Sequence, residues 1–199
     1  MRSVLRFVAS VMMVSGLLLI GDAAVTLAWQ EPISAFMADR EQQKLKDAFE
    51  EPPARVVRRQ PLRGDAIARI DIPAIDKTAY VVEGTDTDSL RKGPGHYPDT
   101  PLPGERGTVG IAGHRTTYGA PFRNIDELHR GDRIILETPD GTYFYRVQRT
   151  RIVDDQALWV TRPVGYDRLV LTACHPLYSA SQRVAVFARL VRRTGSRVR

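Results

Sequence analysis

The sequence predicts an all-β domain, either a sandwich or a closed barrel, that follows an N-terminal apolar segment. From Ala66 to Val191, short runs of apolar and β-branched residues are separated by frequent turn residues. The predicted strands are 67–72, 79–82, 108–112, 133–138, 142–153, 168–173 and 183–191. Only Asp88 to Lys92 and Pro121 to Leu128 show a helical pattern in this region. The core is therefore expected to be built from strands.

The N-terminal segment is long enough to cross a membrane. Residues Phe7 to Trp29 are almost entirely apolar or small, and Asp22 is their single charge. A run of about 20 such residues spans a bilayer as a helix. Arg2 and Arg6 precede it, which favours an inside N-terminus. We assign 1–30 to a transmembrane anchor. A signal peptide cleaved in the region of Asp22-Ala23-Ala24 is the alternative, and both interpretations place the domain outside the cytoplasm.

The next segment is predicted to contain an amphipathic helix. Its helix runs from Pro32 to Phe49 and is stopped by Glu51-Pro52-Pro53. Its apolar members are Ile33, Phe36, Met37, Leu45 and Phe49. We assign 31–64 to a juxtamembrane stalk that spaces the domain from the membrane. The sequence leaves open whether this helix instead packs on the domain.

The folded domain is assigned to 65–193. Its clearest turn is Pro139-Asp140-Gly141, which separates two predicted strands. The strand after this turn alternates polar residues with apolar or aromatic ones, among them Tyr143 and Tyr145. This alternation is typical of a strand with one buried face. The last residues, 194–199, form a basic tail.

Composition excludes several classes of function. The chain has 199 residues, enough for one domain with appendages, and a net charge of +6. Much of the positive excess lies in 55–63 and 189–199, and no nucleic-acid-binding motif accompanies it. We therefore expect no nucleic-acid partner, and a basic surface suits an anionic cell envelope. The only cysteine is Cys174, so no intrachain disulfide can form.

Three residues have the chemistry of a cysteine-based active site. Cys174 ends an apolar predicted strand, where a side chain can meet a substrate. His114 also follows a strand, and Ala112 and Gly113 before it permit close approach. A histidine can hold a cysteine as thiolate and later protonate a leaving amine. Arg183 begins the final strand and can stabilise an oxyanion. Spacing alone does not show that the three meet.

These residues lie in segments that resemble the sortase family. Val170-Leu171-Thr172-Ala173-Cys174 is similar to the T-L-x-T-C signature of sortases. Ala112-Gly113-His114-Arg115 is similar to their catalytic-histidine motif. Cys174-His175-Pro176, followed by Ser179 and Arg183, is similar to their C-x-P…S…R pattern. The resemblance covers 67–191 and makes 65–193 the catalytic domain.

The resemblance implies a fold, a reaction and partners. It implies an eight-stranded sortase-type β-barrel with Cys174 as nucleophile, His114 as general acid/base and Arg183 as oxyanion or substrate-positioning residue. Family members cleave a sorting signal between Thr and Gly through a thioacyl-enzyme. The expected partners are sorting-signal-bearing surface proteins, and a peptidoglycan precursor or a pilin amine as acceptor. No cofactor is expected. We predict no metal site, because the histidines lack close ligand spacing.

The subclass rests on the loops around the predicted site. The loop 114–122 and the His96-Tyr97-Pro98 segment are similar to class E sortases, with class D as the main rival. Class E members favour a Leu-Ala-x-Thr-Gly signal, and Tyr118 matches the tyrosine associated with that choice. We expect Tyr118, Thr116, His96 and Ala173 to contact the substrate. Ala173 departs from the signature, which has Thr at this position, so the oxyanion geometry is left open.

Two other functions fit the same residues. A cysteine hydrolase would use water as acceptor, and product analysis with and without amine separates it from a transpeptidase. A non-catalytic envelope-binding domain would keep Cys174 as a buried core residue. In that case the thiol would react with alkylating agents only after unfolding. The ordered motifs favour the membrane-anchored transpeptidase, with its catalytic domain outside the cell membrane.

Overall fold

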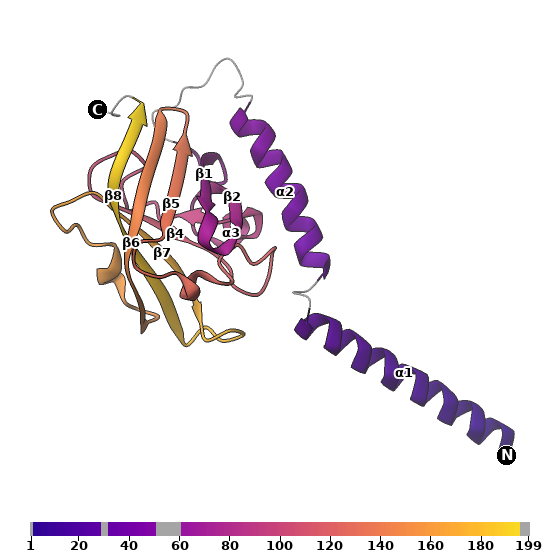
Figure 1. Cartoon of the computed structure of the whole chain (residues 1–199). Coiled ribbons are helices and arrows are strands. Elements are labelled where there is room, and N and C mark those ends of the chain that lie inside the picture. The colour runs from indigo at the N-terminus through magenta and orange to yellow at the C-terminus, as the bar shows by residue number, and fades with distance from the viewer. Residues whose placement is uncertain (1, 29–31, 51–60, 196–199) are drawn as a thin grey trace.

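A closed β-barrel forms the body of the protein, with two long helices on its N-terminal side (Figure 1). The computed structural model describes residues 2–28, 32–50 and 61–195. The long helices are α1 (Arg2–Ala28) and α2 (Pro32–Glu50). The shorter helical elements are α3 (Thr87–Lys92) and three 3₁₀ turns, η1 (Pro73–Ile75), η2 (Ile125–Glu127) and η3 (Leu158–Thr161).

The barrel has eight strands, which confirms the predicted fold class. They are β1 (Ala66–Ile72), β2 (Lys77–Glu83), β3 (Gly95–His96), β4 (Thr108–Ala112), β5 (Arg133–Thr138), β6 (Gly141–Asp154), β7 (Arg168–His175) and β8 (Gln182–Gly195). Their order around the barrel is β1-β2-β3-β4-β7-β8-β6-β5, and β5 closes on β1. The β2–β3 and β4–β7 pairs are parallel and the other pairs are antiparallel.

Strand β7 is buried on both of its faces. Leu169 and Leu171 point into the barrel, where they join the main core. Val170 faces outward and packs with Phe187 of β8 and Val160 of η3. A strand covered on both faces has a continuous apolar sequence rather than an alternating one. This explains the unbroken apolar run that precedes Cys174.

Helix α1 has the length and composition of a membrane span. Its candidate span, Arg2–Val25, has a mean hydropathy of 2.1, and no part of it is buried against the rest of the chain. An unburied apolar helix of this length fits the hydrocarbon core of a bilayer. Trp29, the last residue of the predicted apolar run, lies outside the described residues.

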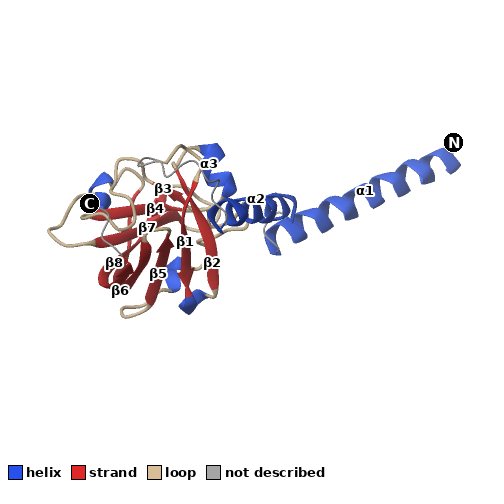
Figure 2. Cartoon of the chain, turned by 90° about the horizontal axis from the view of Figure 1, so that it is seen from above, coloured by secondary structure: helices blue, strands red, loops and turns tan. Residues whose placement is uncertain are grey.

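Helix α2 packs on the barrel, which answers the question that the sequence left open for 32–50. It lies along the side of the barrel that carries β1 and β2 (Figure 2). Leu45 is buried with Tyr80 and Val82 of β2, and Phe49 packs against this cluster. Residues 51–60 of the predicted stalk lie outside the described residues.

Gln42 attaches α2 to the exposed edge of β2. Its Nε2 donates to the carbonyl oxygens of Tyr80, at 3.0 Å, and Lys92, at 2.7 Å. Its Oε1 accepts a hydrogen bond from the Tyr80 N–H at 2.7 Å. The amide therefore satisfies both main-chain groups of Tyr80, as a neighbouring strand would.

We expect Gln42→Ala to loosen α2 from the barrel. The substitution leaves three main-chain groups without their partner, and the expected loss of stability is about 1–2 kcal/mol. Thermal unfolding of the full chain in detergent measures it. Gln43→Ala is the matched control, because Gln43 is exposed and bonds only within α2, to Asp47. Equal loss in both variants would show that Gln42 does not dock the helix.

Candidate active site

The three predicted catalytic residues come from three neighbouring strands. β4, β7 and β8 are adjacent in the barrel. β4 and β7 run parallel, so the residues that follow them meet at the same end of the barrel. The antiparallel β8 begins at that end. His114 follows β4, Cys174 lies near the end of β7 and Arg183 near the start of β8. The topology thus brings all three residues to one end of the barrel.

Cys174 and Arg183 lie opposite each other on the adjacent strands β7 and β8. They are direct partners in the antiparallel register of β7 and β8. Directly opposed residues point to the same face, with Cβ atoms about 4.5–5.5 Å apart. The Cys174 thiol is free and partly exposed. The Arg183 Nη1 donates to the carbonyls of Ala180, at 2.8 Å, and Gln182, at 2.9 Å, which holds the guanidinium against the loop before β8.

The loop that carries His114 is attached to the nucleophile's strand. The Gly113 N–H donates to the carbonyl of Thr172 at 3.0 Å, which extends the β4–β7 pairing to the residue before His114. The Phe122 N–H donates to the His114 carbonyl at 3.0 Å and closes the loop. A Cβ at Gly113 would lie 2.5 Å from the buried Phe122 ring. Gly113 therefore permits close approach of a side chain, the Phe122 ring.

The His114 imidazole is half-buried and lies next to the Tyr118 ring. The two ring centroids are 5.2 Å apart and the planes are tilted by 43°. Burial lowers the pKa of His114 below its usual value of 6.5, because desolvation disfavours the charged ring. The neutral ring predominates at neutral pH and can accept a proton from a thiol.

The lowered pKa of His114 predicts an acid-sensitive fold. The unfolded chain binds this proton at a higher pH than the folded chain, so protonation favours unfolding. Stability is therefore lost as the pH falls below 6.5 towards the folded pKa. We expect the melting temperature of His114→Gln to fall less than that of the wild type between pH 7.5 and 5. His129→Gln, at an exposed histidine, is the control and should follow the wild type. Parallel curves for all three proteins would contradict the prediction.

The loop beyond His114 has an unusual backbone that other segments hold in place. Tyr118 and Ala120 have φ angles of 50° and 40°, in the left-handed region that residues with a Cβ seldom occupy. The Tyr118 N–H donates to the Oγ of Ser34 on α2 at 3.2 Å. Thr116, the other predicted contact in this loop, is partly exposed. Strained backbone persists where the surroundings fix it, and here α2 is part of those surroundings.

Arg115 was not predicted as a functional residue, yet it connects the parts of the site. Its side chain is only 3% exposed, and its Nη2 lies 2.7 Å from the Asp126 carboxylate. Its Nε donates to the Arg123 carbonyl at 2.9 Å. Its Nη1 lies 3.4 Å from the Cys174 carbonyl oxygen and 3.3 Å from Nδ1 of His175. One guanidinium therefore joins the histidine loop to the end of β7.

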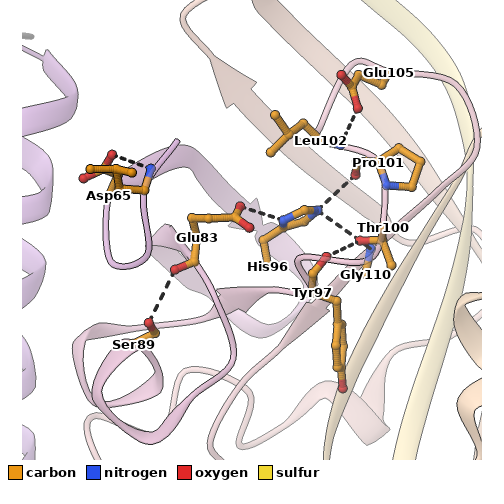
Figure 3. Close-up of polar contacts among 11 residues, drawn as sticks. Asp65, Glu83, Ser89, His96, Tyr97, Thr100, Pro101, Leu102, Glu105 and Gly110 are labelled. Atoms are coloured by element: carbon orange, nitrogen blue, oxygen red, sulfur yellow. Dashed lines mark hydrogen bonds and ion pairs between the residues drawn. The ribbon is translucent and has the colours of Figure 1, made fainter. Parts of the chain in front are cut away.

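His96 does not lie on the open face of the site. It is 1% exposed, and its Nδ1 is 2.8 Å from the carboxylate of Glu83 (Figure 3). Its Nε2 is 3.0 Å from the Pro101 carbonyl oxygen and 3.0 Å from Thr100 Oγ1. The ring therefore supports the loop after β3 from inside, and the structure offers a substrate no access to it.

Ala173 is also placed away from the open face. It is 4% exposed and belongs to the barrel core with Leu169 and Leu171. Thr172 lies on the opposite face of β7, the face shared with Cys174, because side chains alternate along a strand. The Thr172 Oγ1 is 2.8 Å from the Tyr97 hydroxyl. A hydroxyl pair thus occupies the Cys174 face, where the sequence had left the role of a missing hydroxyl open.

Tyr97 and Arg115 are the residues that sequence reasoning missed. Both lie inside segments that resemble sortase motifs, but nothing in their spacing indicates a contact with β7. Gly110 is the signal that goes with Tyr97, since a Cβ at Gly110 would lie 2.7 Å from the tyrosine ring. A glycine within a short strand indicates close approach of another group.

Comparison with known proteins places the chain in a family. The sequence model of the Sortase domain matches residues 70–191. Sortase D of Bacillus subtilis is 36% identical over 136 residues, which cover 66% of this chain and 67% of that protein. Sortase SrtE1 of Streptomyces coelicolor is 32% identical over 144 residues, which cover 64% of this chain and 41% of that protein.

Solved structures agree with the sequence comparison. Sortase E of Streptomyces avermitilis has a TM-score of 0.61 and 32% identity, covering 67% of this chain and 93% of that chain. A Clostridium perfringens sortase D5 transpeptidase has a TM-score of 0.68 and 27% identity, covering 78% of this chain and 99% of that chain. The family match spans most of the chain and contains both Cys174 and His114. The chain belongs to the sortase family of cysteine transpeptidases.

Proposed function

We propose that this sortase cleaves a C-terminal Leu-Ala-x-Thr-Gly or Leu-Pro-x-Thr-Gly sorting signal between Thr and Gly and transfers the protein to an amine. The observation that carries the proposal is the arrangement of three residues at one end of the barrel. Cys174 is directly opposite Arg183, and the His114 loop is bonded to the same strand through Gly113 and Thr172. A nucleophile, a base and a fixed cation on adjacent strands form the minimal set for acyl transfer.

The reaction proceeds in two steps. The Cys174 sulfur attacks the carbonyl carbon of the substrate Thr, and Arg183 stabilises the negative charge that develops on its oxygen. The Thr–Gly C–N bond breaks, and His114 passes the proton that it took from the Cys174 thiol to the leaving glycine amine. An acceptor amine then attacks the thioester, gives up a proton to His114, and expels the Cys174 thiolate. The net change is one amide bond broken and one formed.

Signal recognition is assigned to the loop after β4. Tyr118 and Thr116 lie in this loop and are partly exposed, and the Tyr118 ring lies next to the His114 ring. We assign them to the residues of the signal before the scissile bond. The loop sequence supports a class E preference for Leu-Ala-x-Thr-Gly, whereas relatives of class D and class E both resemble the chain. His96 supports the neighbouring loop from within, and Ala173 supports the nucleophile's strand.

The setting of the reaction is the outer surface of the cell membrane. Helix α1 supplies the single span, and Arg2 and Arg6 at its start favour a cytoplasmic N-terminus. The barrel then lies outside the cytoplasm. Its partners are surface proteins that carry the signal and a peptidoglycan precursor or pilin subunit that supplies the amine.

A peptide transfer assay tests the proposed function. The full chain in detergent is mixed with Leu-Ala-x-Thr-Gly and Leu-Pro-x-Thr-Gly peptides and an amine acceptor, and the products are identified by mass spectrometry. We expect an amide between the Thr carboxyl group and the acceptor, formed faster from the Leu-Ala peptide. Hydrolysis alone at high amine concentration would favour a cysteine protease, and intact peptides would exclude both enzymes.

A further inference from the structure

Helix α2 has an apolar face that the barrel does not cover. Ile33 is 77% exposed, Phe36 is 60% exposed and Met37 is 58% exposed. Their spacing of three and four residues places them on one face of the helix. Ser34 and Ala38, on the other face, are buried. We call Ile33, Phe36 and Met37 the apolar stripe. The sequence pattern had grouped these three with Leu45 and Phe49, but of these five only Leu45 and Phe49 pack on the barrel.

The apolar stripe lies next to the membrane span along the chain. α1 ends at Ala28 and α2 begins at Pro32, so the connection spans at most about 14 Å. Figure 1 shows the end of α1 and the start of α2 close together. The Arg40 guanidinium lies 5.1 Å from the centre of the Phe36 ring, at the border of the stripe. Large apolar side chains edged by a cation are typical of a helix that lies in a membrane interface.

We propose that the apolar stripe rests in the outer surface of the lipid bilayer and that α2 thereby holds the histidine loop at the membrane. Continuity with the span identifies the bilayer as the partner of this face. The stripe occupies the first two turns of α2, so it reaches the interface as soon as the chain leaves the membrane. This assignment does not depend on the identity of the enzyme's substrate.

The same two turns of α2 contact the active-site loop on their other face. Ser34 Oγ accepts the hydrogen bond of the Tyr118 N–H at 3.2 Å. The Ala38 methyl lies 3.5 Å from the position of a Cβ on Gly119. One helix, with a diameter of about 10 Å, therefore separates the bilayer from the loop that follows His114.

The position of α2 at the membrane determines which substrates react fastest. This consequence rests on the proposed function. Some peptides are held near the bilayer by their own lipid or apolar segment. Their scissile bond then lies at the same distance from the membrane as the active site. Tethering two partners to one surface raises their effective concentration. A soluble peptide gains nothing from the stripe, because it approaches from bulk water.

Depth-dependent quenching tests the contact directly. The full chain, with Trp29 and Trp159 changed to Phe, is reconstituted in phosphatidylcholine–phosphatidylglycerol vesicles with or without brominated acyl chains. We expect the fluorescence of Phe36→Trp to be quenched by the brominated lipid. Leu158→Trp is the matched control, because Leu158 is 79% exposed on η3, away from α2, and should not be quenched. Equal fluorescence of Phe36→Trp in both kinds of vesicle would overturn the proposal, including the case in which a second copy of the chain covers the stripe.

A pair of peptides tests the consequence. The triple variant Ile33→Ser, Phe36→Ser, Met37→Ser is compared with the wild type on one signal peptide, either soluble or attached to a lipid through a short spacer. We expect the rate on the lipid-attached peptide to fall about tenfold and the rate on the soluble peptide to stay within about twofold. Equal loss on both peptides, or no loss on either, would overturn the substrate preference. If the wild type cleaves neither peptide, the proposed function fails, and the quenching experiment still decides the membrane contact.

Discussion

Cys174→Ala is expected to abolish both cleavage and transfer of a sorting-signal peptide. The substitution removes the only thiol of the chain, and no thioester can then form. We expect the rate to fall by at least about 10⁴-fold, as is typical when the nucleophile of a cooperating set is removed. Mass spectrometry of the peptide products over several hours measures both outcomes.

The fold should be unaffected by this change. Cys174 is partly exposed at the end of β7, so loss of its sulfur leaves little cavity. Ser181→Ala is the matched control, because Ser181 is exposed in the loop before β8 and should leave the rate unchanged. Residual activity of a tenth or more in Cys174→Ala, with an unchanged melting temperature, would exclude covalent catalysis by this residue.

Arg115→Met is expected to damage both stability and catalysis. The variant keeps the volume of the side chain but removes the cation that meets Asp126 and two main-chain carbonyls. Because the guanidinium is 3% exposed and Asp126 is 35% exposed, we expect a loss of about 2–3 kcal/mol, below that of a fully buried pair. We also expect kcat to fall about tenfold to a hundredfold, since the His114 loop loses its link to β7.

Two further variants separate positioning from general destabilisation. Arg106→Met removes an exposed arginine and should leave both stability and kcat unchanged. Arg115→Lys keeps the charge but lacks the planar fork, so it should recover stability more fully than kcat. Kinetics are measured well below each melting temperature. A variant that loses stability but keeps its full kcat under these conditions would show that Arg115 is structural alone.

Most of the barrel could be predicted from the sequence, because its strands have strong apolar patterns. The predicted strand 108–112 has the bounds of β4, and the predicted strand 168–173 ends two residues before the end of β7. β3 could not be predicted, since Gly95 and His96 alone cannot show alternation. The segment 121–128 was predicted as helix but contains only the 3₁₀ turn η2. Its apolar members, Phe122 and Ile125, are instead buried in the barrel core.

The way α2 packs on the barrel could not be predicted from its local sequence. Its apolar pattern predicted a helix, and a helix is present. The apolar residues of the pattern lie on two faces of the helix, and the contacts of Gln42 and Leu45 with Tyr80 show which face meets the barrel. A polar side chain that caps a strand edge leaves no periodic signal. The candidate catalytic set could be predicted because family motifs name it, whereas Arg115 acts through distant partners such as Asp126.

The most direct test of the account is the intact mass of the enzyme during turnover. The full chain is mixed with excess Leu-Ala-x-Thr-Gly peptide without amine and quenched with acid within seconds. The account predicts a mass increase equal to the peptide fragment that ends in Thr, located on Cys174 by proteolytic mapping and removed when an amine is added. Cleaved peptide with no adduct on Cys174 at any time, or an adduct on another residue, would contradict the account.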